Sequence, residues 1–419
     1  MCALIADNSI KTRKEYMNVK EKQEYKKELF VVIPTYWQGK STRKPDPDDL
    51  VFDHPTFLDG DDTLSASLES LAKTEHPDSF KVLVLSAAVH PSLEYEVQEA
   101  VDRIIEQFRT RLDIGHFHAK KLREVQDRLQ SLSLPRSFLT LDGYASIRNC
   151  QLAIPAILGA EVIAAIDDDE LVEKDYPSMV LEYVGSPGMD GIAGRYRYTE
   201  GKTLVHDRFE DIKQPSLFQK KQAYQNEVYK AIEARAERIT DTSIVLGGNM
   251  VFSKKLFMNV PFDPFVRRGE DIDYMINSMM TNFTWKCDKN LMIDHYPPAC
   301  KETNKLQEDV MRFLYEKAKI EASQNKAGII PVKAEQLGPY PGNFLKEDLQ
   351  EEAFKTLSDR PKEIEKEPWY LSAEEVIQRG VALGERVGEF FAYAELWPKA
   401  MKALCADKQT IRILEEMFS

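Results

Sequence analysis

The segment VIAAIDDDE, residues 162–170, joins a short apolar run directly to four carboxylates. An apolar run of this length, without polar alternation, is typical of a strand buried on both faces of a parallel sheet. Two similar runs precede it: LFVVI at 29–33, which we expect to end at Pro34, and FKVLVLSAA at 80–88. Segments with apolar residues at helical spacing lie between them. This alternation predicts an α/β fold with right-handed crossovers, in which a mainly parallel sheet is flanked by helices.

The same periodicities predict the remaining elements. We expect helices at 64–71, 92–112, 113–135, 147–158, 217–238, 270–282 and 303–322, and further strands at 137–141, 192–198, 244–252 and 291–293. A long loop rich in glycine, proline and aspartate is expected at 38–60, and a linker at 323–345.

These elements divide the chain into three regions. Residues 1–28 are predicted to be a charged helical lead-in, and 303–419 a helical C-terminal region. Between them, 29–302 forms the α/β domain, with a first half at 29–185 and a second half at 186–302. In such sheets, ligands bind beyond the carboxyl ends of the strands. We therefore expect the loops that follow these strands to form the site.

Composition narrows the class of protein. The chain of 419 residues carries a net charge of -13, which disfavours nucleic acid as a partner. Its five cysteines are odd in number and widely spaced, as in a protein with reduced thiols. The N-terminus lacks the apolar run of a signal peptide, and the sequence contains no run of about 20 apolar residues of the kind that spans a membrane. We therefore expect a soluble, cytoplasmic protein.

The acidic segment 167–170 is the first candidate for chemistry. Adjacent carboxylates repel each other unless a positive charge lies among them, and a divalent cation with oxygen ligands is the usual remedy. The alternative is a solvated helix start, where acids meet the positive end of the helix dipole. The position at the end of a predicted buried strand favours the metal site.

Four segments together resemble the GT-A glycosyltransferases, and family 2 in style. They occur in the expected order and span about residues 29–300: VVIPTY at 31–36, GYASIRN at 143–149, AIDDD at 165–169, which resembles the DxD signature, and GGN at 247–249 with RGEDID at 268–273. The resemblance implies a GT-A type, Rossmann-like domain with a helical C-terminal extension. Within the domain it implies a nucleotide-binding half at 29–185 and an acceptor half at 186–302. It implies a hexosyltransferase that takes a nucleoside-diphosphate sugar as donor and a hydroxyl group, of unknown identity, as acceptor.

The resemblance also implies roles for individual residues. Asp169, Asp167 and a late histidine, His295, would hold the metal, Mn²⁺ or Mg²⁺, and imidazole suits manganese better. Asp271 would be the general base of an inverting transfer, with Glu270 beside it. The donor nucleotide would contact Pro34, Thr35, Tyr36, Arg148, Asn149, Asp167 and Asp168, and the acceptor Gly247, Gly248, Asn249 and Arg268.

Other interpretations remain open at this point. A retaining GT-A transferase, of the kind that makes glucosylglycerate or mannosylglycerate, also pairs DxD with a late histidine. A nucleotidyltransferase is disfavoured, since PTYWQ at 34–38 is not a glycine-rich basic loop. A non-catalytic sugar-nucleotide-binding or scaffolding protein would keep the fold, with the helical tail as an element for homo-oligomer assembly. The segment 86–88 lacks the aspartate that family 2 often places against the base.

Overall fold

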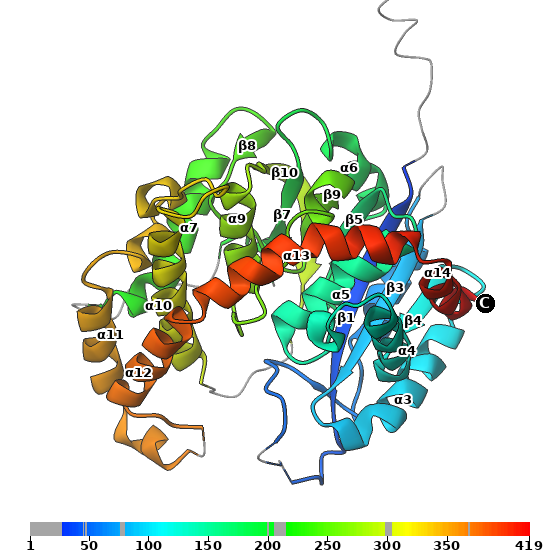
Figure 1. Cartoon of the computed structure of the whole chain (residues 1–419), viewed down its shortest axis with the longest axis horizontal. Helices are drawn as coiled ribbons and strands as arrows, with labels where there is room; N and C mark the ends of the chain where they lie inside the picture. Colours follow the sequence, from blue (N-terminus) through cyan, green and yellow to red (C-terminus); the bar gives the residue numbers. More distant parts are fainter. Residues whose placement is uncertain are drawn as a thin grey trace, which may run out of the picture.

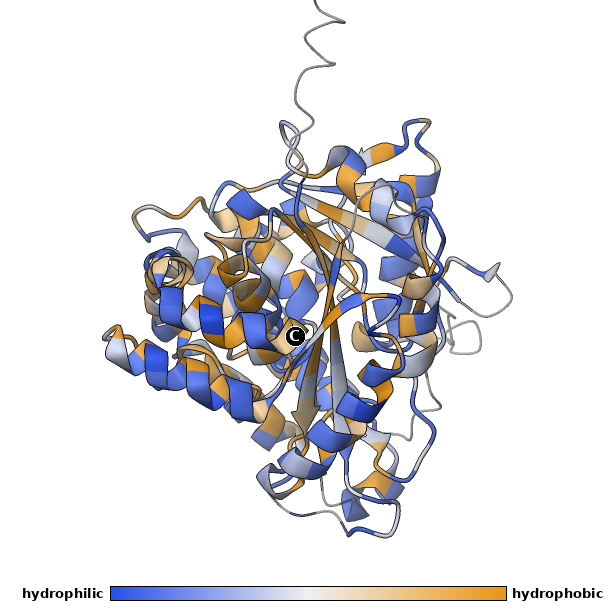
Figure 2. Ribbon diagram, turned by 90° about the vertical axis from the view of Figure 1, so that its right-hand side faces the viewer, coloured by the Kyte–Doolittle hydropathy of each residue, from blue (hydrophilic) through white to orange (hydrophobic). Residues whose placement is uncertain are grey.

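The computed structural model describes residues 27–44, 46, 48–75, 80–198, 201–204, 215–297, 304–367 and 369–419. The predicted helical lead-in lies outside these residues except for its last two. The described chain forms one central sheet between layers of helices (Figures 1 and 2). Figure 2 shows apolar residues gathered in the strands and on the helix faces that cover them.

The sheet of the described residues has the strand order β4-β3-β1-β5-β9-β7-β10-β6, with β2 paired to β1 and β8 paired to β10. Its members are β1 (Leu29–Gln38), β2 (Thr56–Phe57), β3 (Lys81–Ala88), β4 (Asp113–Phe117), β5 (Val162–Ala165), β6 (Glu170–Val172), β7 (Gly191–Arg197), β8 (Ile239–Asp241), β9 (Met250–Ser253) and β10 (Trp285–His295).

The two halves of the sheet differ in direction. Strands β4, β3, β1 and β5 are all parallel, as the apolar runs predict. Strand β9 is antiparallel to both β5 and β7, whereas β7 and β10 are parallel to each other. The predicted α/β class is therefore confirmed, with a parallel first half and a mixed second half.

The helices flank the sheet and continue beyond it. They are α2 (Leu64–Ala72), α3 (Glu94–Glu106), α4 (Ala119–Ser131), α5 (Tyr144–Ile157), α6 (Tyr176–Tyr183), α7 (Lys221–Glu233), α8 (Lys254–Phe257), α9 (Glu270–Met280), α10 (Lys305–Ser323), α11 (Leu349–Ser358), α12 (Ala373–Gly384), α13 (Val387–Ala406) and α14 (Lys408–Glu415). Across the described residues, none of these helices combines the length and apolar character that crossing a membrane requires.

Two sequence predictions about strands are wrong. Residues 113–117 form β4 rather than helix, and 136–138 form a single 3-10 turn where a strand was expected at 137–141. Gly115 and His116 interrupt the apolar pattern of β4, which hides it from periodicity. His116 is nevertheless buried, because its Nε2 lies 2.7 Å from Ser86 Oγ and its Nδ1 lies 2.7 Å from Asp102 Oδ1. Both ring nitrogens are thus satisfied inside the fold.

Strand β1 also continues past Pro34, where we expected it to end. Val32 faces β5, since its carbonyl accepts from Ile166 N–H at 3.2 Å, and Pro34, two residues on, faces the same side. The β5 ladder has already ended, with Ala165 opposite Val32. An N–H group at this position would therefore have had no partner in β5, so proline costs the sheet no hydrogen bond here. Strand β1 continues beyond it and places Tyr36 at the carboxyl ends of the strands.

The C-terminal helices pack onto the sheet domain. Helix α13 crosses α5, and α14 lies against α4 (Figure 1). Trp397 of α13 is fully buried and donates its indole N–H to Phe257 O at 2.9 Å. The segment predicted as a linker is also packed, since Leu337, Tyr340 and Phe344 are buried.

A buried ion cluster anchors α10. Lys319 is fully buried; its Nζ lies 2.7 Å from Asp263 Oδ2 and 2.5 Å from Asp273 Oδ1, and it donates to Asn277 Oδ1 at 3.1 Å. Tyr315 also donates to Asp263, at 2.7 Å. Removing one partner from such a cluster leaves buried charge without compensation, which is costly.

We expect Lys319→Met to lower the free energy of unfolding by about 3 kcal/mol or more, because it leaves two buried aspartates without their cation. The matched control on the same helix is Lys317→Met, which removes only a partly exposed pair with Glu321 and should cost about 0.5 kcal/mol or less. Urea denaturation at neutral pH measures both. Equal losses in the two variants would contradict the anchoring role of Lys319.

Candidate active site

One cavity of about 460 Å³ opens at the carboxyl ends of β1, β5, β7 and β10. Tyr36 comes from β1, Asp167 follows β5, and Tyr196 and His295 lie near the ends of β7 and β10. Helices α7, α9 and α10 supply other walls. The cavity therefore lies where an α/β sheet holds its ligands, and it brings together strand-end residues that are far apart in the chain.

The three aspartates after β5 point to different partners. Asp167 accepts a hydrogen bond from Arg148 Nη2 at 2.7 Å, and Asp168 accepts one from Thr35 Oγ1 at 2.6 Å. Asp169 approaches His295, with 3.5 Å between Asp169 Oδ2 and His295 Nε2. Of the three, only Asp169 is directed at the predicted late histidine.

Asp169, Glu170 and His295 form a candidate metal centre. One ligand atom from each lies within 4.8 Å of the other two. Glu170 is fully buried, and the pKa of its carboxyl is raised well above the usual value by burial and then by the charges of Asp167 and Asp169. His295 Nδ1 is buried and has no hydrogen-bond partner among the described residues. Two carboxyl groups and an imidazole so close together are a ligand set that fits a divalent cation.

This centre differs from the predicted ligand set in one member. Asp167, expected as a ligand, pairs with Arg148 instead, while Glu170 joins Asp169 and His295. Gly248 makes this possible, since a Cβ there would collide with the Glu170 carboxylate. Because residue 248 has no side chain, the backbone just before β9 can lie directly against the buried Glu170 carboxyl group.

Arg148 is surrounded by acceptors from the protein itself. Besides Asp167, it donates to Gln151 Oε1 at 3.1 Å and to Glu270 Oε1 at 3.4 Å. Burial alone would lower its pKa, but the neighbouring carboxylates raise the pKa well above the usual value. Its guanidinium therefore compensates two acids of the site rather than extending freely toward a ligand.

Glu270 and Asp271 begin α9. The preceding residue, Gly269, has a φ of 72°, a left-handed conformation that favours glycine. Burial and then the charge of Asp271 raise the pKa of Glu270 to about 7. Asp271 Oδ2 accepts from Gly247 N–H at 3.0 Å and Oδ1 accepts from Ile272 N–H at 2.8 Å, so two backbone donors fix its carboxylate in the cavity.

Aromatic side chains form another part of the cavity wall. Tyr36 and Tyr144 line the cavity, and the Tyr36 ring lies 5.0 Å from that of Tyr144 and 4.5 Å from that of Phe52. Phe52 belongs to the long loop predicted at 38–60, and the neighbouring Asp53 N–H donates to Tyr144 Oη at 2.5 Å. This loop therefore contributes Asp53 and His54 to the lining, while its Phe52 packs against the two tyrosine rings.

Several predicted site residues have structural partners instead. Asn149 exchanges two hydrogen bonds with the Phe262 backbone, at 2.9 and 2.8 Å, and Asn249 donates to Arg195 O and Leu291 O at 3.1 Å each. Pro34 lies within β1, and the Thr35 hydroxyl is bonded to Asp168. None of these four lines the cavity, whereas all the other predicted residues except Gly248 do.

Several lining residues had no role assigned from the sequence: Asp53, His54, Tyr144, Tyr198, Lys221, Lys305, Arg312 and Tyr340. Tyr144 belongs to the quoted segment 143–149. Tyr196, on the strand predicted at 192–198, also lines the cavity. Arg312 and Tyr340 come from the C-terminal region, in which no local pattern indicated a site.

Solved structures align with the chain at low sequence identity. Mannosyltransferase PcManGT from Pyrobaculum calidifontis, in complex with GDP-Man and Mn²⁺, aligns with a TM-score of 0.41 at 15% identity, covering 99% of this chain and 98% of that one. S. aureus TarS 1-349, in complex with UDP-GlcNAc, gives 0.44 at 13% identity, covering 93% and 90%. The chain covers 55% of the longer TarS chain. No protein-family model and no curated protein matches the sequence.

We expect Asp169→Ala to weaken Mn²⁺ binding by at least about tenfold to a hundredfold, because it removes one of three ligands. The control is Asp175→Ala, an exposed aspartate on the same stretch of chain. Isothermal titration with Mn²⁺ measures both affinities. Unchanged binding in Asp169→Ala, or an equal loss in Asp175→Ala, would contradict the assignment of this centre.

Proposed function

We propose that the protein is a metal-dependent glycosyltransferase that transfers a sugar from a nucleoside-diphosphate sugar to an acceptor hydroxyl. One observation carries the proposal: a carboxylate–imidazole centre and a separately fixed carboxylate, Asp271, face one cavity. The motif resemblance at 31–36, 143–149, 165–169 and 268–273 supports the same reaction. A metal centre alone would fit many hydrolases and binding proteins, so the second carboxylate is what favours group transfer.

Asp169, Glu170 and His295 would hold the divalent ion, Mn²⁺ or Mg²⁺. When bound, this ion supplies Lewis-acid stabilisation of the negative charge that develops on the diphosphate leaving group. The protein side chains bind and orient the two substrates around it. Arg148 keeps Asp167 and Glu270 paired, so that buried acids beside the centre do not repel the anionic donor.

Tyr36 and Tyr144 offer the donor an aromatic wall, and Phe52 packs against both rings. A nucleoside base has an aromatic face, and ring pairs with centroids 4.5 to 7 Å apart are favourable. The rings of Tyr36 and Tyr144 line the cavity and already contact each other. Donor binding would therefore rest on this wall and on the metal centre, and not on Arg148 as the sequence suggested.

Asp271 is the general base of the proposal. Two backbone N–H groups fix its carboxylate in the cavity, where an acceptor hydroxyl can come within hydrogen-bond reach. The acceptor oxygen forms a bond to the anomeric carbon and its proton goes to Asp271. The bond from that carbon to the diphosphate oxygen breaks, and its electron pair leaves with the diphosphate. Attack from the side opposite the leaving group inverts the anomeric centre.

Asp271→Asn should lower kcat by about a hundredfold or more while donor binding is kept, because the amide has nearly the same shape but cannot take the proton. Transfer to a panel of acceptors gives kcat, and titration of the nucleoside-diphosphate sugar with Mn²⁺ gives donor affinity. The anomeric configuration of the product, read by NMR, provides an independent check. Near-normal kcat in the variant, or a retained configuration, would contradict the role of Asp271.

A further inference from the structure

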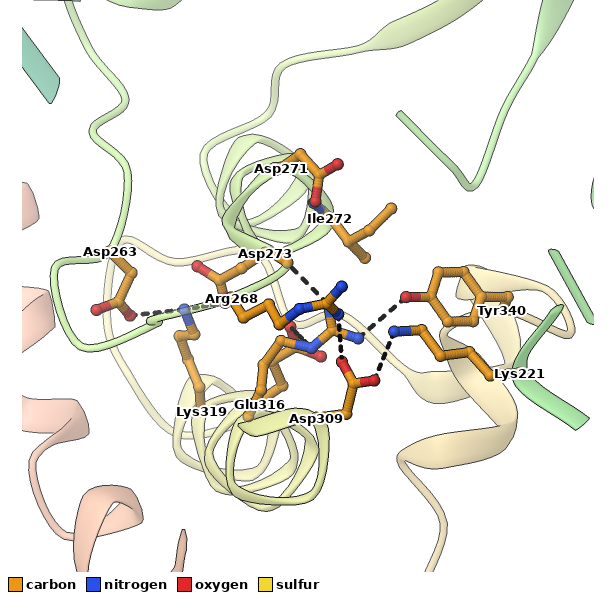
Figure 3. Close-up of polar contacts among 12 residues, drawn as sticks. Lys221, Asp263, Arg268, Asp271, Ile272, Asp273, Asp309, Glu316, Lys319 and Tyr340 are labelled. Atoms are coloured by element: carbon orange, nitrogen blue, oxygen red, sulfur yellow. Dashed lines mark hydrogen bonds and ion pairs between the residues drawn. The ribbon is translucent and has the colours of Figure 1, made fainter. Parts of the chain in front are cut away.

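Four cations gather at the end of the cavity beside the start of α9, and we call this group the basic end. Its members are Lys221 at the start of α7, Arg268 just before α9, and Lys305 and Arg312 of α10, all of which line the cavity. Figure 3 shows Arg268 and Lys221 converging on Asp309, with Tyr340 beside them. Asp271 lies on the first turn of α9, the helix that begins just after Arg268.

Asp309 and Asp53 are the acids that contact the basic end. Asp309 Oδ2 lies 2.7 Å from Lys221 Nζ and its Oδ1 lies 3.3 Å from Arg268 Nη1. Asp53 Oδ2 lies 3.4 Å from Arg268 Nη2 and 3.6 Å from Lys305 Nζ. The pairs at 3.3 to 3.6 Å are long for charge-assisted hydrogen bonds, so these cations keep capacity for a further acceptor.

Arg312 is held mainly by neutral oxygens. Its Nη2 donates to Tyr340 Oη at 3.0 Å and its Nη1 donates to Gly269 O at 3.3 Å. Its neighbour Glu316 lies 3.5 Å from its Nε, but burial raises the pKa of Glu316 to about 8, so this acid is largely uncharged at neutral pH. A side chain at Gly269 would collide with the Arg312 guanidinium, and the glycine therefore lets the cation reach the start of α9.

The cations of the basic end outnumber the acids that contact them. Four cations face the carboxyl groups of Asp309 and Asp53, and the Nε atoms of Arg268 and Arg312 are buried without a hydrogen-bond partner among the described residues. Buried donors on a charged group are costly to leave unmade, so the excess of cations indicates a site for an anion. The metal centre, which would compensate the donor diphosphate, is built on β6 and β10 and on the turn between β5 and β6 instead.

We propose that the basic end binds an anionic group, a phosphate or a carboxylate, carried by the acceptor itself, and that this contact places the acceptor hydroxyl at Asp271. The inference rests on the proposed function and names the acceptor class that the proposed function leaves open. Lys221, Arg268 and Arg312 bind the anion and take no part in proton transfer. The transferred sugar forms its new bond to a hydroxyl oxygen of the acceptor, while the anionic group is unchanged.

The test uses glycerol phosphate, glycerate and uncharged glycerol as matched probes, titrated into protein that already holds Mn²⁺ and a nucleoside diphosphate. We expect one or both anionic probes to bind and glycerol not to bind, and the phosphate and carboxylate arms tell the two sources of charge apart. Lys221→Gln and Arg268→Gln should each lower the affinity for the anionic probe about tenfold to a hundredfold, as expected for the loss of one charged hydrogen bond. The two residues lie on different elements, so misfolding of one variant leaves the other.

Arg267→Gln is the matched control. Arg267 is exposed, and its substitution removes the same charge one residue away from Arg268. It should bind the anionic probes as the unchanged protein does. If Mn²⁺ and nucleoside diphosphate do not bind to the unchanged protein, the proposed function fails. If they do bind, two results would show that the inference about the acceptor is wrong. One is that the anionic probes bind no better than glycerol. The other is that Arg267→Gln lowers the affinity for the anionic probes as much as Arg268→Gln does.

Discussion

The site depends on one electrostatic constraint, the crowding of carboxylates around a single guanidinium at the end of β5. Asp167 and Glu270 pair with Arg148, and Glu170 lies buried beside them. Burial raises the pKa of each of these three carboxyls, which means that their charged forms need further compensation. The proposed divalent ion supplies that compensation at Asp169, Glu170 and His295. The glycines at 247 and 248 follow from the same crowding, because side chains there would strike Arg148 and Glu170.

Helix α10 and Tyr340 of the C-terminal region line the cavity, so this region does not form a separate appendage. Lys319 ties α10 to Asp263 and Asp273, two residues that flank the start of α9. That anchor positions Arg312 two turns earlier on the same helix, where its guanidinium meets Gly269. A structural ion cluster and a proposed ligand-binding cation thus share one helix, which links the stability of the tail to the shape of the site.

Much of this arrangement could be predicted from the sequence. Strand-end position brought Asp167, Asp169 and His295 to one cavity, because the carboxyl ends of a sheet converge in space whatever the rest of the chain does. Asp271, in the first turn of α9, was indicated by its motif and not by a strand end. The glycines, prolines and aspartates at 38–60 predicted the long loop, whose Asp53 and His54 line the cavity. Residue type was a poorer guide for Asn149 and Asn249, since a buried amide serves as well to satisfy backbone groups as to bind a ligand.

Other features had no local signal to find. Strand β4 was missed because Gly115 and His116 break its apolar pattern, although the histidine is satisfied by Ser86 and Asp102. The basic end draws on residues that lie 44 to 91 positions apart in the sequence, Lys221, Arg268 and Arg312, and only the fold brings them together. The spacing of apolar residues describes each helix by itself. It does not indicate which polar side chains of one helix will lie beside those of another.

The central claim is that Asp169, Glu170 and His295 hold a divalent ion that completes this acidic edge. Pulsed electron paramagnetic resonance of the protein with one equivalent of Mn²⁺ and a nucleoside diphosphate tests it most directly. We expect bound Mn²⁺ with hyperfine coupling to an imidazole nitrogen and to phosphorus. The nitrogen coupling should be lost in His295→Ala. Free aqueous Mn²⁺, or bound Mn²⁺ whose spectrum does not change in His295→Ala, would contradict it.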